Sequence, residues 1–136
     1  MDIDKVREFV RRNHRAVLAT RKADGGIQQS PVLVSVDGQG HLVVSSRETA
    51  FKTRNVRRDP WVQLCLLNDG FFGEWMFVEG RAKVVSLPEA MEPLVEYFRS
   101  ISGEHDDWDA YRAAMEQDKR VVLRIEPERA GPDREG

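Results

Sequence analysis

The chain has 136 residues, a formal net charge of −2 and 40% hydrophobic residues, and this length and composition predict one folded domain. The near-balanced charge excludes a general attraction to nucleic acid or to anionic membranes, so we expect neither as a partner. No apolar run reaches the roughly 20 residues that a membrane-spanning helix needs. The single cysteine, Cys65, excludes an intramolecular disulfide, and we expect a cytoplasmic protein.

The first part of the chain predicts one helix and three strands joined by tight turns. Residues 3–13 repeat apolar side chains at helical spacing, with charged residues between them. Short apolar runs then alternate with Asp-Gly turns, in which both residues tolerate a positive φ. Three strands in succession on such turns form an antiparallel meander. The expected strands are 16–20, 27–36 and 41–45.

After these strands, the sequence predicts a polar helix over residues 47–58. Ser46 is placed to cap that helix, and the Asp-Pro pair after it ends it, because a residue before proline disfavours helical backbone. Residues 61–67 predict a strand that is apolar on both faces and therefore central in its sheet. A long strand follows over 75–85, where Gly80 predicts a bulge or a close backbone approach.

The last third of the chain predicts two helices and a final strand. Ser86 and Glu89 have the spacing of a capping box, and apolar residues then repeat at helical spacing up to Ile101. Polar and charged residues dominate the end of the chain, which favours a loose tail. The expected ranges are 107–117 for the second helix, 120–125 for the strand, 1–128 for the single domain and 129–136 for the tail.

These elements amount to about six mostly antiparallel strands with three or four helices, which is an α+β fold. The turn spacing favours a small closed barrel. The histidines lie too far apart for a zinc site, and no metal is expected. Neither a G-x-S-x-G nucleophile motif nor either common glycine-rich nucleotide loop is present. Cys65 stands in the middle of a strand between two leucines, and we interpret it as a buried structural thiol.

A cluster of basic residues is the most informative feature for function. Five cations lie within twelve residues, just after Ser45 and Ser46 at a strand-to-helix junction. A helix N-terminus with hydroxyls and cations suits an anion, because arginine and lysine make charge-assisted hydrogen bonds to phosphate oxygens. The alternative is a solvated surface helix, and the residues alone favour neither. The five cations are Arg47, Lys52, Arg54, Arg57 and Arg58.

A second feature is the aromatic content of residues 61–85, which hold five aromatic side chains. Trp75 and Met76, with Phe71 and Phe72 before them, are able to form an apolar wall for a planar ring or to pack as ordinary core. Aromatic side chains are enriched at protein interfaces. So much aromatic surface on a small barrel therefore favours an oligomer.

Four short motifs, taken in chain order, carry a resemblance to a known family. They are LAT with a following Asp-Gly turn and SPV, at residues 18–32; KTRNVRRDP at 52–60; VEG at 78–80; and GEHDDWDAYR at 103–112. The first motif resembles the opening of the pyridoxamine-phosphate-oxidase-like split β-barrel proteins. The other three resemble the branch of that family that uses the deazaflavin coenzyme F-420. The resemblance covers roughly residues 3–128.

The resemblance implies a homodimer of split β-barrels with two cofactor grooves at the dimer interface. It implies that reduced F-420 donates a hydride from its deazaflavin ring to an electron-poor organic substrate. Matched by position, Lys52 contacts the cofactor phosphate, with Ser45 and Asn55 beside it. Arg54 faces the phosphate or the oligoglutamate tail. The residues implied to line the ring are Gln28, Ser30 and Pro31, with Trp75 and Met76 from the partner side of the groove.

Three functions remain open on this basis. The first is an F-420-dependent reductase. The second keeps the fold but binds FMN, as an oxidase or flavin reductase, with the FMN phosphate on the basic helix. The third is a non-catalytic protein that stores or carries a cofactor. No side chain is assigned a catalytic role, because a bound cofactor carries the chemistry and the final proton can come from solvent.

Overall fold

Residues 3–131, which the computed structural model describes, form one seven-stranded sheet and four helices. The strands are β1 (Arg15–Arg21), β2 (Ile27–Leu33), β3 (Ser35–Val36), β4 (Leu42–Arg47), β5 (Trp61–Leu67), β6 (Trp75–Val85) and β7 (Arg120–Gly131). The helices are α1 (Ile3–Arg12), α2 (Phe51–Arg58), α3 (Met91–Ser102) and α4 (Trp108–Gln117). All neighbouring strands pair antiparallel, in the order β2-β1-β5-β6-β7-β4-β3. The fold is therefore α+β, and β5 is an interior strand, between β1 and β6, as predicted.

The sheet is curled, because its two edge strands follow each other in the chain. The strand expected over 27–36 is divided, since β2 pairs with β1 whereas β3 pairs with β4 at the opposite edge. Between them the Val34 N–H donates to the His14 carbonyl at 2.8 Å, and the His14 ring Nδ1 lies 2.9 Å from the Val34 oxygen. These contacts extend the β1–β2 pairing by one residue, because Arg15 pairs with Leu33. The chain passes from one edge of the sheet to the other at Val34, so the sheet is curled into a half-barrel. The expected three-strand meander is wrong, and the sheet has seven strands rather than six.

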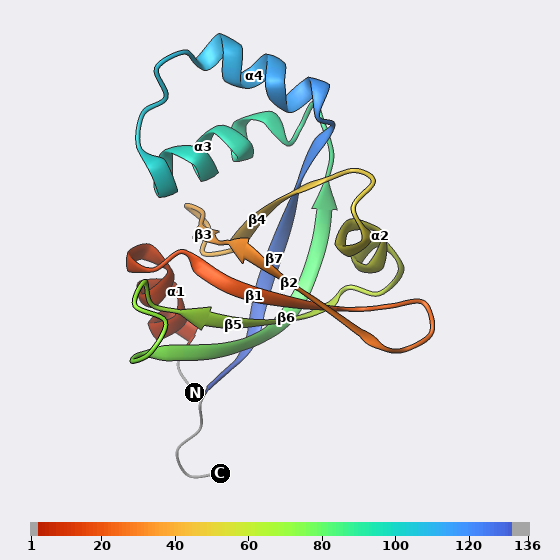
Figure 1. The fold of residues 1–136 in the computed structure, drawn as a ribbon, viewed down its shortest axis with the longest axis vertical. Helices are drawn as coiled ribbons and strands as arrows, with labels where there is room; N and C mark the ends of the chain where they lie inside the picture. Colours follow the sequence, from red (N-terminus) through yellow and green to blue (C-terminus); the bar gives the residue numbers. More distant parts are fainter. Residues whose placement is uncertain (1–2, 132–136) are drawn as a thin grey trace.

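Two apolar clusters hold the fold together. Aliphatic side chains fill the inside of the half-barrel, and α1 closes one end of it with Val6, Phe9 and Val10. The second cluster lies outside β4 and β7, where α3 and α4 cover Val43 and Val122. Figure 1 shows α1 and α2 at opposite ends of the half-barrel and the α3–α4 pair stacked above it. The end occupied by α2 therefore carries the basic cluster.

Gly80 marks an irregular position in the pairing of β6 with β7. The register shifts between Glu79 and Gly80, which confirms the predicted bulge. A β-carbon built on Gly80 would lie 2.1 Å from the Glu126 carbonyl oxygen and 3.2 Å from the Pro127 α-carbon. Real β-carbons do not approach backbone atoms so closely, so glycine is required here by close approach rather than by its φ angle.

Helix α2 begins four residues later than the sequence predicts. Arg47 still belongs to β4, and the turn that follows ends at Ala50, which provides no side-chain cap. The Ser46 hydroxyl does not cap the helix, because it lies in the buried sheet and hydrogen-bonds to the Thr53 hydroxyl at 2.8 Å. The Thr53 hydroxyl in turn donates to the Arg47 carbonyl at 2.6 Å. These two hydroxyls fix α2 against the end of β4.

The predicted capping box at Ser86 is also wrong. Helix α3 begins at Met91, and residues 87–90 form a turn before it. The Ser86 hydroxyl instead accepts a hydrogen bond from Arg57 at 3.0 Å and lies 3.4 Å from a Glu48 carboxylate oxygen. A contact between distant parts of the chain has replaced the local one.

Two further expectations are corrected at the sheet. Strand β7 continues to Gly131 and pairs with β6, so residues 129–131 belong to the sheet rather than to a tail. The rest of the expected tail, residues 132–136, lies outside the described residues. Cys65 is partly exposed rather than buried, because β5 alternates and places it on the outward face. None of the helices within residues 3–131 is long and apolar enough to cross a membrane.

Candidate functional site

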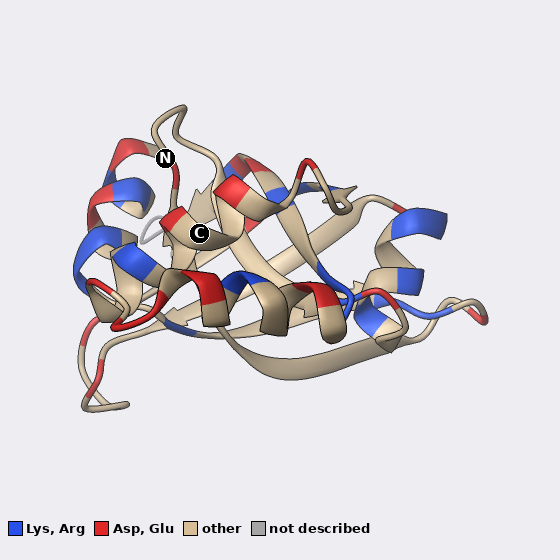
Figure 2. Ribbon diagram, turned by 90° about the horizontal axis from the view of Figure 1, so that it is seen from above, with Lys and Arg blue, Asp and Glu red and all other residues tan. Residues whose placement is uncertain are grey.

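Helix α2 positions most of the residues that the sequence assigns to an anion site. Thr53, Asn55 and Val56 are buried and hold the helix against the half-barrel. The remaining side chains point outward or along the sheet, and most of them are basic. Figure 2 shows this concentration of Lys and Arg on the short helix at the right of the molecule.

Asn55 connects α2 to the first two strands. Its side-chain amide donates to the Thr20 hydroxyl at 3.0 Å and to the Gln28 amide oxygen at 3.1 Å. Its amide oxygen accepts a hydrogen bond from Arg58 at 3.2 Å. The structure therefore brings the predicted residues Gln28 and Asn55 into direct contact, and the polar capacity of the Asn55 side chain is taken up by protein groups.

We expect Asn55→Ala to lower the free energy of unfolding by about 1–3 kcal/mol, because Thr20 and Gln28 lose a buried donor. Urea unfolding of the variant beside the wild type measures the difference. Thr49→Ala, at an exposed position in the turn before α2, is the matched control and is expected to change little. Coincident unfolding curves for Asn55→Ala and the wild type would show that this network does not stabilise the fold.

The five cations of the basic cluster differ in their partners. Arg57 forms an ion pair with Glu48, and Arg47 lies 4.0 Å from Asp118. Arg58 donates to the Arg21 carbonyl and to Asn55. Within residues 3–131, neither Lys52 nor Arg54 has a carboxylate at ion-pair distance. These two cations are therefore available to an external anion.

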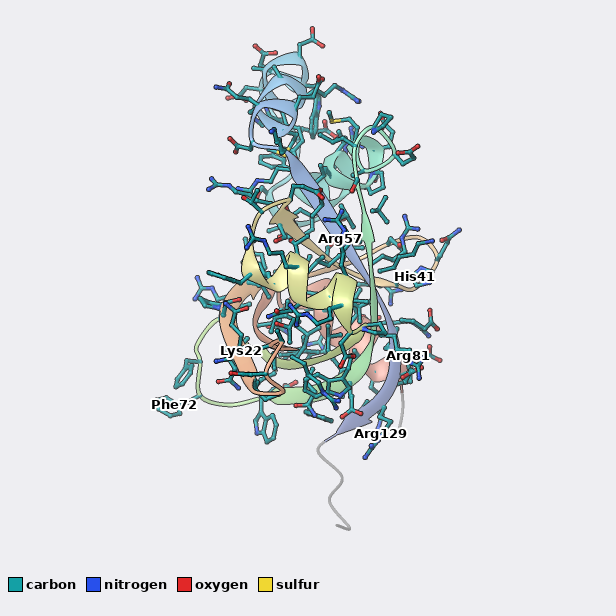
Figure 3. The ribbon with its side chains drawn as sticks, turned by 90° about the vertical axis from the view of Figure 1, so that its right-hand side faces the viewer. Lys22, His41, Arg57, Phe72, Arg81 and Arg129 are labelled. Carbon is teal, nitrogen blue, oxygen red and sulfur yellow. The ribbon has the colours of Figure 1, made fainter. Side chains whose placement is uncertain are left out.

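A pocket of about 510 Å³ lies between α2 and the β1–β2 hairpin. Gln28 and Asn55 contribute polar groups to its lining, and Lys22, Arg54 and Arg58 contribute cations. The Phe51 ring is exposed in it, with the Arg54 guanidinium 5.7 Å from the ring centroid. Figure 3 looks onto α2 and shows Lys22, from the hairpin, below the helix. The lining residues are Lys22, Ala23, Asp24, Gln28, Phe51, Arg54, Asn55 and Arg58. We call this the α2 pocket.

Lys52 does not line the α2 pocket and lies on the side of the helix that is influenced by Arg120 of β7. Burial lowers the pKa of its ammonium group, and the charge of Arg120 lowers it further. Arg120 also acts on Tyr97, whose pKa is raised to about 12 by burial, while a hydrogen bond from the Ser45 backbone opposes that rise. The Tyr97 hydroxyl donates to the Leu33 carbonyl at 2.9 Å, so it bridges the end of β2 to β4.

Three of the predicted residues lie elsewhere on this chain. Pro31 is on the outward face of β2, beside Val17 and Leu67 in a shallow apolar hollow. Trp75 and Met76 line a pocket of about 540 Å³ against α1, at the end of the half-barrel far from α2. Ser30 shares a face of β2 with Gln28. One chain therefore unites Gln28, Arg54 and Asn55 but separates them from the aromatic wall.

Sequence reasoning missed Lys22, Phe51, Tyr97 and Arg120. The position of Lys22 beside an Asp-Gly turn, two elements before a basic helix, was a usable signal for a basic pocket. Tyr97 and Arg120 come from α3 and β7, and no local pattern connects either residue to α2. Only the folded chain places them beside Lys52 and Ser45.

Comparison with known proteins identifies the fold. Residues 3–132 match the family described as pyridoxamine 5'-phosphate oxidase. A conserved hypothetical protein of Mycobacterium tuberculosis, Rv2991, is 25% identical over 96% of this chain and 82% of its own, with a TM-score of 0.75.

Two further solved structures share the fold at lower identity. An F-420 reductase is 20% identical over 91% of this chain and 94% of its own, with a TM-score of 0.71. HutZ, the heme storage protein of Vibrio cholerae, is 19% identical over 96% and 94%, with a TM-score of 0.68. The family match spans nearly the whole chain, and the curled antiparallel sheet agrees with a split barrel. The chain therefore belongs to the pyridoxamine 5'-phosphate oxidase family.

Proposed function

We propose that the chain is an oxidoreductase in which reduced coenzyme F-420 supplies a hydride to an electron-poor organic substrate. The observation that carries this proposal is the pair of cations Lys52 and Arg54, which have no carboxylate partner among the described residues. Family membership supports an oxidoreductase, and an F-420 reductase shares the fold. The KTRNVRRDP motif that resembles the F-420 branch contains both cations.

The residues present fit a phosphate-bearing planar cofactor. Lys52 would hold the phosphate, with the Ser45 hydroxyl on the same side of the sheet. Arg54, at the rim of the α2 pocket, would face the phosphate or an acidic tail. Gln28 and Ser30 present polar groups from one face of β2, suited to the edge of a heteroaromatic ring. Asn55 would act through Gln28, whose amide oxygen it fixes.

The protein itself would bind and orient the cofactor and would exclude water from around its ring. When bound, reduced F-420 supplies the hydride, so no nucleophile or acid–base pair is required from the protein. Lys52 and Arg54 anchor the charged part of the cofactor and thereby fix the position of the ring. Side chains around the ring exclude water, which strengthens electrostatic interactions in the site. The final proton comes from solvent.

The competing readings are an FMN-binding oxidase or reductase and a non-catalytic cofactor-binding protein. The family description favours the FMN-binding enzyme. The fold shared with a heme storage protein favours the non-catalytic protein. The experiment is turnover: reduced F-420 is mixed with the protein and a panel of quinones, enones and nitroaromatics, and oxidation of the deazaflavin is followed by absorbance. We expect oxidation faster than in protein-free controls. Tight binding without turnover on any acceptor would contradict the enzymatic proposal.

We also propose that the protein is a homodimer with the site completed across the interface. The outward face of the sheet exposes large apolar side chains, of which Ile27 is 50%, Leu33 45% and Trp75 48% exposed. Phe72, 84% exposed, projects from the β5–β6 loop in Figure 3. Exposed apolar surface of this extent marks interaction sites. Pro31, Trp75 and Met76 would then reach a second copy's cofactor rather than their own.

Light scattering of the wild type is expected to give twice the 15.6 kDa mass of one chain. Leu33→Glu places a charge on the apolar outward face and should give the mass of one chain. The matched control is Ala113→Glu, at an exposed apolar residue on α4 that lines none of the pockets described above. A wild-type mass of one chain, or a dimer that Leu33→Glu leaves intact, would contradict an interface on this face.

A further inference from the structure

We infer that Arg120 is a second cation of the anion site and binds the cofactor phosphate together with Lys52. This inference rests on the proposed function, because the anion is taken to be the phosphate of the cofactor. No motif assigns Arg120 to the site. Three features of Arg120 support the assignment, namely its place in the sheet, its buried Nε without an acceptor and the cation near it.

Arg120 begins β7, beside Arg47 of β4. Its side chain is on the outward face that α3 covers, the same face as Val122 in the apolar cluster under that helix. There the Arg120 charge acts on the Lys52 ammonium group and on the phenols of Tyr97 and Tyr111. Arg120 therefore lies where α2, β4 and α3 meet.

The Arg120 guanidinium is incompletely satisfied. Its Nε is buried and has no hydrogen-bond acceptor among the described residues. The nearest carboxylate, Asp118, is 3.8 Å from that atom and is shared with Arg47 at 4.0 Å. A buried donor without an acceptor costs free energy, and native proteins provide partners for nearly all such groups. A phosphate oxygen would be a suitable acceptor.

Lys52 is a second cation near Arg120. It has no carboxylate partner within residues 3–131, and burial together with Arg120 lowers its pKa. Two partly buried cations that repel each other are stabilised when an anion binds between them. Arginine presents a planar fork for two phosphate oxygens, whereas lysine acts as a point charge, so the pair suits one phosphate.

Arg124 provides a matched control on the same strand and the same face. Its Nε is also buried without an acceptor, and its nearest carboxylate, Asp37, is at 3.9 Å. Arg124 lines a separate pocket between β3 and α3, with Asp37, Glu92 and Glu96, and no lysine lines that pocket. A variant of Arg124 therefore shows the effect of losing any arginine from this face, whereas a variant of Arg120 shows the effect of losing the cation near Lys52.

The test compares Arg120→Gln, Arg120→Lys and Arg124→Gln with the wild type. F-420 titrations give dissociation constants, and thermal unfolding with and without inorganic phosphate gives a second readout. We expect Arg120→Gln to weaken F-420 binding about tenfold or more and to lose the phosphate-induced rise in Tm. Arg120→Lys should restore part of both. Arg124→Gln should stay within about twofold of the wild type, as expected for a residue without a phosphate contact.

The outcomes separate this inference from the proposed function. If the wild type binds neither F-420 nor FMN, but phosphate stabilises it and not Arg120→Gln, Arg120 is an anion-binding residue and the cofactor proposal fails. Equal F-420 affinity and an equal phosphate-induced rise in Tm for Arg120→Gln and the wild type would overturn the inference. So would the absence of any stabilisation of the wild type by phosphate.

Discussion

Replacing Gly80 with alanine is expected to lower the free energy of unfolding by about 3 kcal/mol, at the upper end of overpacking effects. The new β-carbon would lie 2.1 Å from the Glu126 carbonyl oxygen and 3.0 Å from the carbonyl carbon. Both are backbone atoms of β7, which is hydrogen-bonded to β6 on one side and to β4 on the other. Because neither neighbour can rotate away as a side chain would, the strands must separate or the bulge must reorganise.

The matched control is Gly38→Ala, since a β-carbon there meets nothing within 4 Å. Urea unfolding followed by circular dichroism measures both variants against the wild type. We expect Gly38→Ala to stay within about 0.5 kcal/mol of the wild type, as surface substitutions usually do. If Gly80→Ala unfolds at the same urea concentration as Gly38→Ala, the close approach of β6 to Glu126 is not a constraint on the sheet.

The second large effect is expected at the cofactor site. Lys52→Ala should weaken F-420 binding by about 1.5–3 kcal/mol, or roughly 10- to 150-fold in Kd, because a charge-assisted hydrogen bond to phosphate is lost. The fold should tolerate this change, since Lys52 has no carboxylate partner in the described part of the chain and its charge is opposed by Arg120. The reduced affinity would then report the lost contact rather than unfolding.

Lys83→Ala is the control for Lys52→Ala, because Lys83 is an exposed lysine on β6 and lines none of the pockets described above. Fluorescence titration with F-420 gives both dissociation constants, and thermal unfolding without ligand confirms that both variants are folded. An unchanged Kd in Lys52→Ala would remove Lys52 from the phosphate site. A loss of equal size in Lys83→Ala would show that general charge, not position, sets the affinity.

Local patterns predicted much of the fold, and contacts between distant segments account for the main errors. The apolar run of β5 indicated a central strand, and Gly80 indicated the bulge in β6. Ser46 and Ser86 have the right residue type and spacing for helix caps. In the folded chain their hydroxyls hydrogen-bond to Thr53 and Arg57 instead. A capping motif describes an isolated helix start and cannot include such competing partners.

The split between β2 and β3 has a similar cause. Alternation continues through Val34, so a single long strand was the natural prediction for 27–36. Whether that strand remains straight depends on the curl of the sheet, because β2 pairs with β1 at one edge and β3 pairs with β4 at the other. The curl of the sheet depends on all seven strands together, so no short stretch of sequence predicts it.

The residue types of the candidate site were predictable from the sequence, but which of its cations lack an ion-pair partner was not. The sequence contained the five cations around α2, yet which of them remain available depends on partners that only the fold provides. Glu48 lies close enough to pair with Arg57, whereas Lys52 faces Arg120 from the far end of the chain. Tyr97 belongs to a helix whose periodicity indicates only core packing, although its hydroxyl hydrogen-bonds to the Leu33 carbonyl at the end of β2.

The most direct test of the cofactor proposal is an equilibrium fluorescence titration of one purified preparation with F-420 and, separately, with FMN. Lys52 and Arg54 have no carboxylate partner among the described residues, and the KTRNVRRDP motif that contains them resembles the F-420 branch. We therefore expect saturable micromolar binding of F-420 and much weaker binding of FMN. Tighter binding of FMN would contradict an F-420 enzyme and favour a flavin oxidase or reductase. Binding of neither would contradict a cofactor site at Lys52 and Arg54.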